Sequence, residues 1–118
     1  MKNLKQELAL FTGSESFYRH PLFRKYIYTE GVQYLAEKGS AYWLLDYIFA
    51  KQEEDRAIQK EPFQAWIIKV KEDKSAVIRV EDGNLEQVAR FELNFTDFPI
   101  QEFRLWFIDK TLLLPSEY

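Results

Sequence analysis

The apolar residues of this chain change their period near Pro62. Before this proline they recur every three or four positions, as on one face of a helix, and after it they alternate with polar residues, as on a half-buried strand. Helices followed by strands, without alternation of the two, are typical of an α+β domain. Because 118 residues are a common length for one domain, we expect residues 1–118 to form a single α+β domain.

Three helices are predicted in the first half of the chain. Apolar residues at helical spacing favour a short helix over residues 2–11. Thr29 is a suitable N-cap for a second helix, which we expect to end at Gly39. Ser40 is then placed to cap a third helix over residues 41–55, whose wide apolar stripe is the clearest helical pattern of the chain. The short connection between the last two predicts an αα-hairpin.

Two further stretches of the first half show no period. Residues 14–23 contain Pro21, which disfavours helix at His20, so this stretch is predicted to be an ordered loop. Residues 51–62 are highly charged and are predicted to be a mobile connection.

Four or five strands are predicted in the second half. The alternating stretches are residues 65–71, 76–81, 88–95, 102–108 and 111–114. Turn sequences follow the first two of them, and Gly83 in the second turn accepts the positive φ of a tight hairpin. An antiparallel meander is the simplest topology for these turns. We therefore expect two or three N-terminal helices packed on one face of a four- or five-stranded antiparallel sheet.

Composition excludes several kinds of chemistry. The chain has no Cys and one His, so it has no disulfide and no thiolate nucleophile, and a metal site would have to combine that His with carboxylates. Its four glycines stand far apart, without the spacing of a phosphate-binding loop, and no Ser lies in a nucleophile elbow. We expect no cofactor and no metal.

No membrane association is expected from the sequence. No apolar run approaches the roughly 18–20 residues that a spanning helix needs, and the first residues lack the apolar stretch of a signal peptide. Together with the absence of Cys, this pattern predicts a cytoplasmic protein.

Charge is unevenly distributed along the chain. The net charge is −3, which argues against nucleic-acid binding over the whole surface, but residues 1–28 contain five basic and two acidic side chains. Within this part, residues 17–28 interleave aromatic with basic side chains and contain no carboxylate. The candidate binding residues of this segment are Tyr18, Arg19, Arg24, Lys25 and Tyr26.

Two interpretations of residues 17–28 are open. Cations interleaved with rings suit the phosphates and stacked bases of a single-stranded nucleic acid. Alternatively, the rings anchor the segment to the core and the cations are their solvated neighbours. If the segment is a binding surface, Arg24→Ala with Lys25→Ala is expected to weaken partner binding and to leave the fold intact.

An acid/base site is the enzymatic alternative. His20 is the one side chain of a type that exchanges protons near neutral pH, and Arg19 beside it disfavours its protonated form. Glu30 and Asp46 are the carboxylates placed to approach it if the αα-hairpin folds over the loop. The three would then serve a small hydrolase-like enzyme. The commoner role for Asp46 is a hydrogen bond to a tyrosine hydroxyl or an arginine.

The number of large rings favours self-association. Trp66, Trp106, Tyr42 and Trp43 are more rings than one small core readily hides, and exposed rings are typical of protein interfaces. We therefore expect a homodimer, with a monomer that has a thick aromatic core as the alternative.

Five blocks of the sequence, taken in order, resemble a family of small uncharacterised bacterial proteins from plasmid, phage and cyanobacterial genomes. The blocks are FYRH from Phe17, YTEGVQYLAE from Tyr28, AYWLLD from Ala41, TDFP from Thr96 and LPSEY from Leu114. The resemblance spans nearly the whole chain, and because that family is of unknown function it implies no activity, cofactor or catalytic residue.

The leading functional hypothesis is therefore a non-enzymatic binding or interaction protein that uses residues 17–28 and acts as a homodimer. The alternative is an acid/base enzyme centred on His20 with Glu30 and Asp46. A third class is a structural component of a larger complex, held through a sheet edge or the C-terminal tail.

Overall fold

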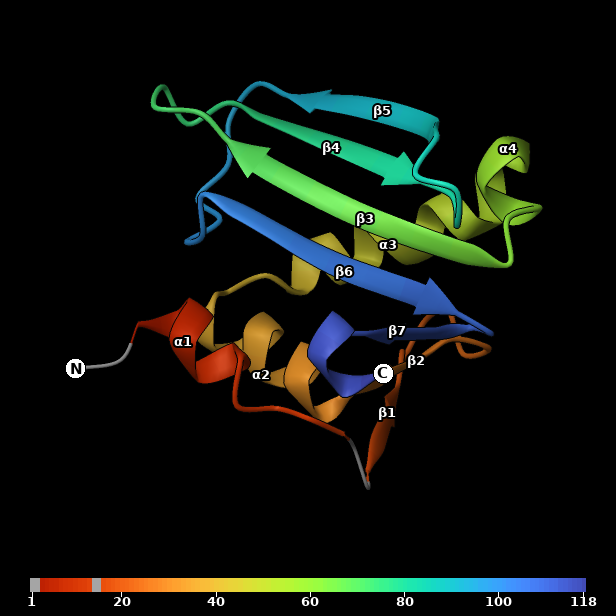
Figure 1. Ribbon diagram of the computed structural model, residues 1–118, viewed down its shortest axis with the longest axis horizontal. Helices are drawn as coiled ribbons and strands as arrows, with labels where there is room; N and C mark the ends of the chain where they lie inside the picture. Colours follow the sequence, from red (N-terminus) through yellow and green to blue (C-terminus); the bar gives the residue numbers. More distant parts are fainter. Residues whose placement is uncertain (1–2, 14–15) are drawn as a thin grey trace.

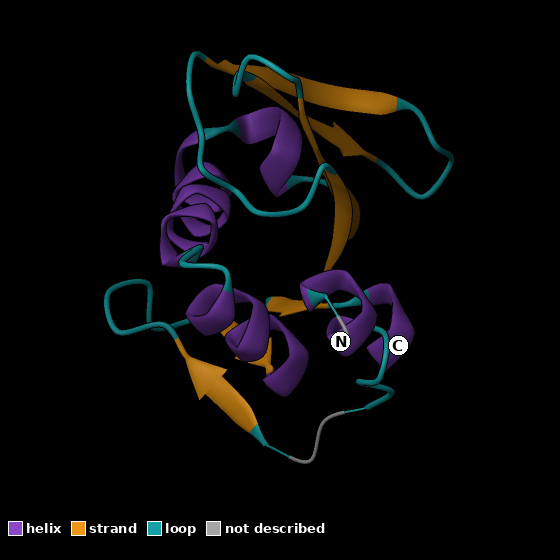
Figure 2. Cartoon of the chain, turned by 90° about the vertical axis from the view of Figure 1, so that its left-hand side faces the viewer, coloured by secondary structure: helices purple, strands orange, loops and turns teal. Residues whose placement is uncertain are grey.

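The computed structural model describes residues 3–13 and 16–118, and its fold is α+β. Figure 1 shows one twisted sheet with the long helix α3 behind it, and the turned view of Figure 2 places helices against one face of that sheet. The α+β class predicted from the sequence is confirmed. No helix of the described residues is long and apolar enough to cross a membrane.

The elements of the described residues are as follows. The α-helices are α1 (Leu4–Leu8), α2 (Glu30–Lys38), α3 (Tyr42–Glu54) and α4 (Arg56–Gln59), and a short 3-10 helix η1 (Pro115–Glu117) follows the last strand. The strands are β1 (Phe17–Arg19), β2 (Ile27–Thr29), β3 (Phe63–Val70), β4 (Ala76–Glu81), β5 (Gln87–Leu93), β6 (Glu102–Ile108) and β7 (Thr111–Leu113).

The strand count and topology predicted from the sequence are wrong in detail. The described residues form a seven-stranded sheet in the order β1-β2-β7-β6-β3-β4-β5. Strands β3, β4 and β5 form the expected antiparallel meander, but β6 returns to pair with β3, and β2 and β7 pair in parallel. Backbone hydrogen bonds fix the return, from Thr96 to Lys74 and from Val70 to Gln101, both at 2.7 Å. After β5, the chain thus crosses the end of the sheet instead of adding another hairpin.

The first strand comes from a stretch that was predicted to be a loop. β1 and β2 form an antiparallel pair with Tyr18 opposite Tyr28. Each strand has three residues, too few to show alternation in the sequence, and β2 gains a second partner only when β7 pairs with it. Residues 14 and 15 of the predicted loop and residue 2 of the first predicted helix lie outside the described residues.

The second helix agrees closely with its prediction, and the start of the third does not. The Thr29 hydroxyl accepts a hydrogen bond from the Val32 backbone N–H at 3.3 Å, and α2 ends at Gly39 as expected. The prediction that Ser40 caps α3 is wrong, because Ser40 has a φ of 51° and the N-cap position is Ala41. The Gly-Ser connection is thus a tight turn and not a helix cap.

Residues 51–62 are mostly helical, whereas a mobile connection was expected. Helix α3 continues to Glu54, and Asp55 then caps α4 by accepting hydrogen bonds from the backbone N–H groups of Ala57 at 3.0 Å and Ile58 at 3.2 Å. Ile58 is fully buried. An apolar side chain and a helix cap therefore help to hold this charged stretch against the core.

Positive φ angles lie at residues other than the glycine that was predicted to need one. Gly83 has no positive φ, and Leu85 in the same turn has a φ of 65°. In the turn between β6 and β7, Asp109 and Lys110 have φ values of 50° and 62°. Two successive left-handed residues are the pattern of a type I′ hairpin turn, which glycine and asparagine usually provide.

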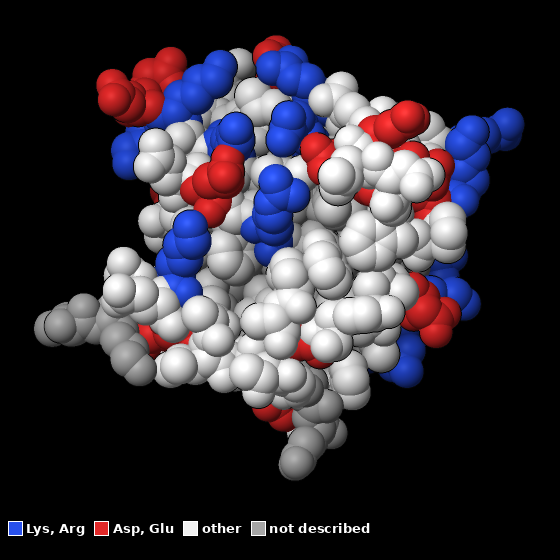
Figure 3. All heavy atoms as spheres, viewed as in Figure 1, with Lys and Arg blue, Asp and Glu red and all other residues white. Residues whose placement is uncertain are grey.

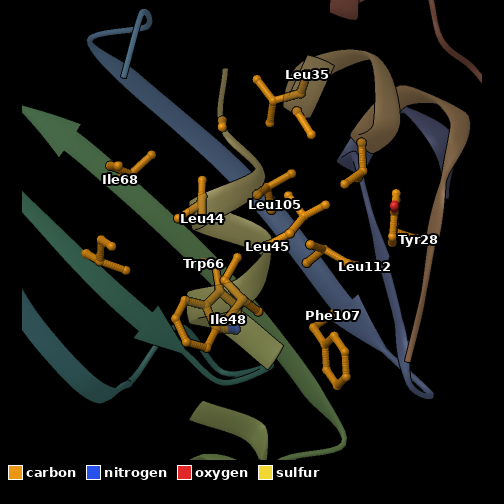
Figure 4. Packing of buried hydrophobic residues seen from close by; sticks show 14 of the residues in the cluster. Tyr28, Leu35, Leu44, Leu45, Ile48, Trp66, Ile68, Leu105, Phe107 and Leu112 are labelled. Carbon is orange, nitrogen blue, oxygen red and sulfur yellow. The ribbon is translucent and has the colours of Figure 1, made fainter. Parts of the chain in front are cut away.

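The core lies between α3 and the sheet. Figure 4 shows Leu44 and Ile48 of α3 packed toward Trp66 of β3 and Leu105 of β6. The Trp66 side chain is only 2% exposed, so this ring is a core residue. Tyr42 remains 43% exposed, which leaves it available at the surface.

The C-terminal tail is bound to the start of α2. The Glu117 carboxylate accepts hydrogen bonds from the Thr29 hydroxyl at 2.6 Å and from the Gly31 backbone N–H at 3.1 Å, which suits a negative charge at a helix N-terminus. Gly31 leaves room for the tail, because a Cβ there would lie 2.5 Å from Leu114 Cδ1 and 2.8 Å from a Glu117 oxygen. The tail and α2 therefore depend on each other.

Candidate functional site

Residues 17–28 form the outermost hairpin of the sheet, which we call the outer hairpin. β1 pairs with β2 on one side and with no other described strand (Figure 1). Phe17, Tyr18 and Leu22 of this segment are 52%, 40% and 75% exposed. Exposed apolar side chains beside an unpaired strand edge are a common place for another chain to bind.

Tyr18 belongs to a group of tyrosines between the outer hairpin and the helices. Its ring stacks on that of Tyr28 with centroids 5.7 Å apart. The pKa of Tyr28 is raised, first by burial and then by its charge interactions with Tyr42 and Tyr18. Gln33 donates a hydrogen bond to the Tyr42 hydroxyl at 2.8 Å. The half-exposed rings of Tyr18 and Tyr42 thus extend the apolar edge onto α3.

Arg19 and Arg24 are both exposed and are connected across the hairpin loop. The Arg19 guanidinium donates a hydrogen bond to the Arg24 backbone carbonyl. This contact holds Arg19 beside the strand edge and leaves further N–H groups of its guanidinium for a partner.

His20 and Asp46, two of the three residues considered for acid/base chemistry, are in contact. His20 Nε2 lies 2.6 Å from Asp46 Oδ1, and Nδ1 accepts hydrogen bonds from the backbone N–H groups of Leu22 at 3.1 Å and Phe23 at 2.9 Å. Nδ1 is therefore the unprotonated nitrogen, and Nε2 carries the hydrogen that is donated to the carboxylate. The ring is buried against Phe23 and Phe49, so both of its nitrogens serve the fold.

Glu30, the third of these residues, does not join the pair. Its carboxylate accepts a hydrogen bond from the Ser16 backbone N–H at 3.1 Å. His20 follows the end of β1 that pairs with Ile27, whereas Glu30 follows the end of β2 that pairs with Phe17, so the two lie at opposite ends of the hairpin. Among the described residues, no group of three or more His, Cys, Asp or Glu side chains is arranged to hold a metal ion.

Lys25 and Tyr26 face Glu53 at the end of α3. The Lys25 ammonium lies 2.8 Å from the Glu53 carboxylate, and the Tyr26 hydroxyl donates a hydrogen bond to the same oxygen. Burial, followed by the hydrogen bond and charge of Glu53, raises the pKa of Tyr26. The bonds from Lys25 and Tyr26 lower the pKa of Glu53. Tyr26 is therefore a neutral donor and Glu53 an anion at neutral pH.

These three residues line a cleft of about 730 Å³. The opposite wall is formed by residues 107–110, at the end of β6 and in the turn before β7. The volume lies within the range of small-molecule sites. The residues that line the cleft do not include those of the acid/base hypothesis.

Gln52 and Gln64 form a buried amide pair beside this cleft. Gln52 Nε2 donates to Gln64 Oε1 at 2.6 Å, and Gln64 Nε2 donates to Gln52 Oε1 at 3.0 Å. The Trp66 indole N–H donates to Gln64 Oε1 at 2.9 Å. This pair and Glu53 were not predicted from the sequence. The available signal was the position of Gln52, four residues after Ile48 on the apolar stripe of α3.

Comparison with known proteins places the chain in a family. Residues 2–118 match a family model described as "Family of unknown function (DUF6876)". The chain belongs to this family. No curated protein and no solved structure matches it. Because DUF6876 is a family of unknown function, membership assigns no activity, cofactor or catalytic residue to the site.

Proposed function

We propose that the chain is a non-enzymatic interaction protein, that its binding surface is the outer hairpin, and that its partner is a second copy of itself. The exposure of Phe17, Tyr18 and Leu22 beside an edge of β1 that pairs with no other described strand carries this proposal. Removing apolar surface from water stabilises a complex by roughly 25 cal/mol per Å², and an open strand edge offers backbone hydrogen bonds to another strand.

Strand β1 is suited to pair with a copy of itself. In a two-fold dimer, residue i of one copy contacts residue j of the other, and j contacts i. If two β1 strands pair antiparallel about Tyr18, Phe17 of each copy lies opposite Arg19 of the other. A guanidinium against a phenyl ring is a favourable cation–π contact, and the Arg24 carbonyl already holds Arg19 beside the edge.

Sedimentation velocity over a range of protein concentrations tests this proposal. We expect a dimer whose dissociation constant rises about tenfold or more in Phe17→Ser with Leu22→Ser, because apolar contact area is lost. Leu85→Ser with Phe95→Ser is the matched control, since these side chains are 76% and 71% exposed and lie at the other edge of the sheet. A monomeric wild-type chain at every concentration, or an equal loss in both variants, would contradict the proposal.

Charge variants in the same hairpin provide a second test. Arg24→Ala with Lys25→Ala is expected to weaken association without changing the thermal midpoint by more than a few degrees, since both side chains are exposed. The loss should be smaller than for the apolar pair, because Lys25 faces Glu53 and the cleft.

The acid/base alternative has less support. A general base needs a nitrogen that a substrate reaches, and His20 uses both of its nitrogens within the chain. Glu30 lies at the far end of the hairpin.

We also propose a cytoplasmic location and a bacterial origin for the chain. The location is supported by the absence of cysteine and the origin by the resemblance of the five sequence blocks.

A further inference from the structure

The open face of the sheet, on the side opposite α3, carries a row of arginines. Arg90 of β5 lies opposite Arg79 of β4, Arg79 lies opposite Ile67 of β3, and Ile67 lies opposite Arg104 of β6. Since neighbouring strands are about 4.8 Å apart, this arginine row spans about 15 Å. Figure 3 shows Lys and Arg side chains gathered over this part of the sheet.

The arginine row is unfavourable for the chain alone. Like charges directly opposite each other on neighbouring strands repel, and Arg79 and Arg90 form such a pair. The Arg79 Nε is buried and has no hydrogen-bond partner among the residues that the structure describes. The Arg79 guanidinium lies 3.6 Å from Glu81, which is longer than a hydrogen bond. An anion bound over the row would relieve the repulsion between these groups.

A purely structural role accounts for only part of the arginine row. Ile67 points to the open face and is nevertheless 1% exposed, because long side chains on the neighbouring strands cover it with their aliphatic stems. Arg79 and Arg104 lie directly beside Ile67 and are placed to provide that cover. Arg90 lies one strand further away, so covering Ile67 does not explain it.

A hollow of about 670 Å³ adjoins the arginine row. Its charged lining consists of Lys69, Lys71, Arg79 and Arg90 with Glu72 and Glu102. Lys69 pairs with Glu102 at 3.2 Å, and Arg90 pairs with Glu92 at 3.0 Å. Exposed ion pairs of this kind contribute little to stability. A phosphate can therefore replace Glu102 beside Lys69, or Glu92 beside Arg90, at modest cost in free energy.

Aromatic rings continue the same face. Trp106 is two residues from Arg104 on β6 and therefore points to the same side, about 7 Å further along the strand. Its ring contacts Phe63 and Tyr118, with centroids 5.2 and 5.6 Å away. Tyr118 is 82% exposed. Trp106 is half-buried, so the row of cations ends beside one partly exposed ring and one exposed ring.

We propose that this open face binds a single-stranded nucleic acid, with phosphates on the arginine row and a base against Trp106. A small phosphate compound would be bound by the cations alone and would not use the rings. Cations beside exposed rings supply both parts of sequence-tolerant single-strand binding, which are neutralised phosphates and stacked bases. The net charge of −3 disfavours binding over the whole surface, so we expect the phosphates where basic side chains gather. The site is separate from the outer hairpin.

Fluorescence anisotropy with labelled oligothymidylate and oligouridylate tests this proposal on the full chain at about 50 mM salt. Arg90→Gln with Arg104→Gln should weaken binding about tenfold or more. The same variant should flatten the slope of log affinity against log salt by about 1.4, because each single-strand phosphate contact contributes about 0.7. Trp106→Leu should weaken binding by about 5- to 150-fold, the range for loss of one base–ring stack.

Matched variants distinguish binding at the open face from binding at the outer hairpin. Arg24→Gln with Lys25→Gln removes the same charge from that hairpin and should leave oligonucleotide affinity unchanged, as should Phe17→Ser with Leu22→Ser. Tyr118→Ala provides a second ring variant at the end of the chain, where loss of folding is not expected. Absent binding at this salt, unchanged binding by the arginine variant, or equal affinity for an abasic oligomer would overturn the proposal.

Discussion

The two ends of the sheet are built in different ways. Strands β3, β4 and β6 pair in register over six or seven residues, whereas β1, β2 and β7 pair over two or three. The short-strand end, formed by β1, β2 and β7, is held by contacts between distant residues, of Glu117 with Thr29 and Gly31 and of His20 with Asp46. The long-strand end, formed by β3 to β6, depends on a repeated pattern of buried side chains. The short-strand end buries fewer side chains, among them Tyr28 and Leu112, and adds these polar contacts between distant residues.

This difference has a consequence for stability. Where many equivalent side chains share the burial, as in β3 and β4, loss of one methyl group costs about 1 kcal/mol. Where one carboxylate satisfies several donors, its displacement leaves all of them without a partner at once. Single substitutions should therefore have larger effects at the short-strand end.

Gly31→Ala is expected to have the largest effect. The added Cβ would lie 2.5 Å from Leu114 Cδ1 and 2.8 Å from a Glu117 oxygen, so both side chains must shift and the Glu117 hydrogen bonds to the start of α2 are disrupted. We expect a loss of about 3 kcal/mol in the free energy of unfolding, measured by urea denaturation. Amide exchange should increase in β2 and β7 more than in β3 and β4.

Gly13→Ala is the control for this variant. No atom lies within 4 Å of a Cβ built at Gly13, so its effect should stay within about 0.5 kcal/mol. An equal effect of the two alanines, or an exchange increase spread evenly over the sheet, would show that the two ends unfold as one unit and that the comparison fails.

His20→Ala is expected to follow, with a loss of about 2–3 kcal/mol. The change removes the bond to Asp46, two acceptor contacts to backbone N–H groups, and the ring packing on Phe49. Asp46→Ala should cost only about 1 kcal/mol, because its carboxylate is largely exposed. Ile78→Val in β4 is the reference at the long-strand end, at about 1 kcal/mol. A smaller loss for His20→Ala than for Ile78→Val would contradict the assigned structural role.

The same difference explains which elements were predictable from the sequence. Strands β4 and β6 have the predicted bounds, because alternation of buried and exposed residues is a local property of six or seven positions. β1 and β2 were missed because three residues carry no period. The parallel pairing of β2 with β7 joins residues more than 80 positions apart, and no local pattern encodes a contact at that separation.

The candidate site was predictable to a similar degree. Composition alone selected residues 17–28, and this segment does form an exposed sheet edge. The neighbours of that segment were not predictable, since Glu53 approaches it only when the end of α3 packs against the outer hairpin. The Gln52–Gln64 pair likewise forms only when α3 packs beside the start of β3. The arginine row likewise appears only once the register of β4 and β5 is known.

The pH dependence of stability tests the contact between Tyr26 and Glu53. Burial and Glu53 raise the pKa of Tyr26, so its contribution is complete below the ordinary tyrosine pKa of about 10 and is lost as the pH rises through the folded value. Tyr26→Phe should cost about 1 kcal/mol at neutral pH, and this difference should shrink above about pH 10. A constant difference up to high pH would contradict the assigned hydrogen bond.

The acid side of the same experiment reports on Glu53. Its pKa is lowered, mainly by the Lys25 bond, so its contribution is present above the ordinary glutamate pKa and is lost as the pH falls through the folded value. Glu53→Gln should therefore flatten the stability profile between about pH 5 and pH 3. An unchanged acid limb would show that this exposed ion pair contributes nothing measurable.

Lys110→Gly is expected to have the smallest effect, and its sign is opposite. Lys110 has a φ of 62°, a conformation that costs a residue with a Cβ about 1 kcal/mol and costs glycine little. We expect a gain of about 0.5–1 kcal/mol in the free energy of unfolding, measured by thermal or urea denaturation.

Lys74→Gly, with a φ of 71° in the turn between β3 and β4, provides the matched change at the long-strand end. The Lys110 carbonyl accepts a hydrogen bond from the Ile27 N–H at 3.0 Å, and glycine keeps that bond, so both turns should gain equally if strain alone decides. A gain at Lys74 with a loss at Lys110 would mean that the Lys110 side chain, which lines the cleft, stabilises the short-strand end through a contact of its own.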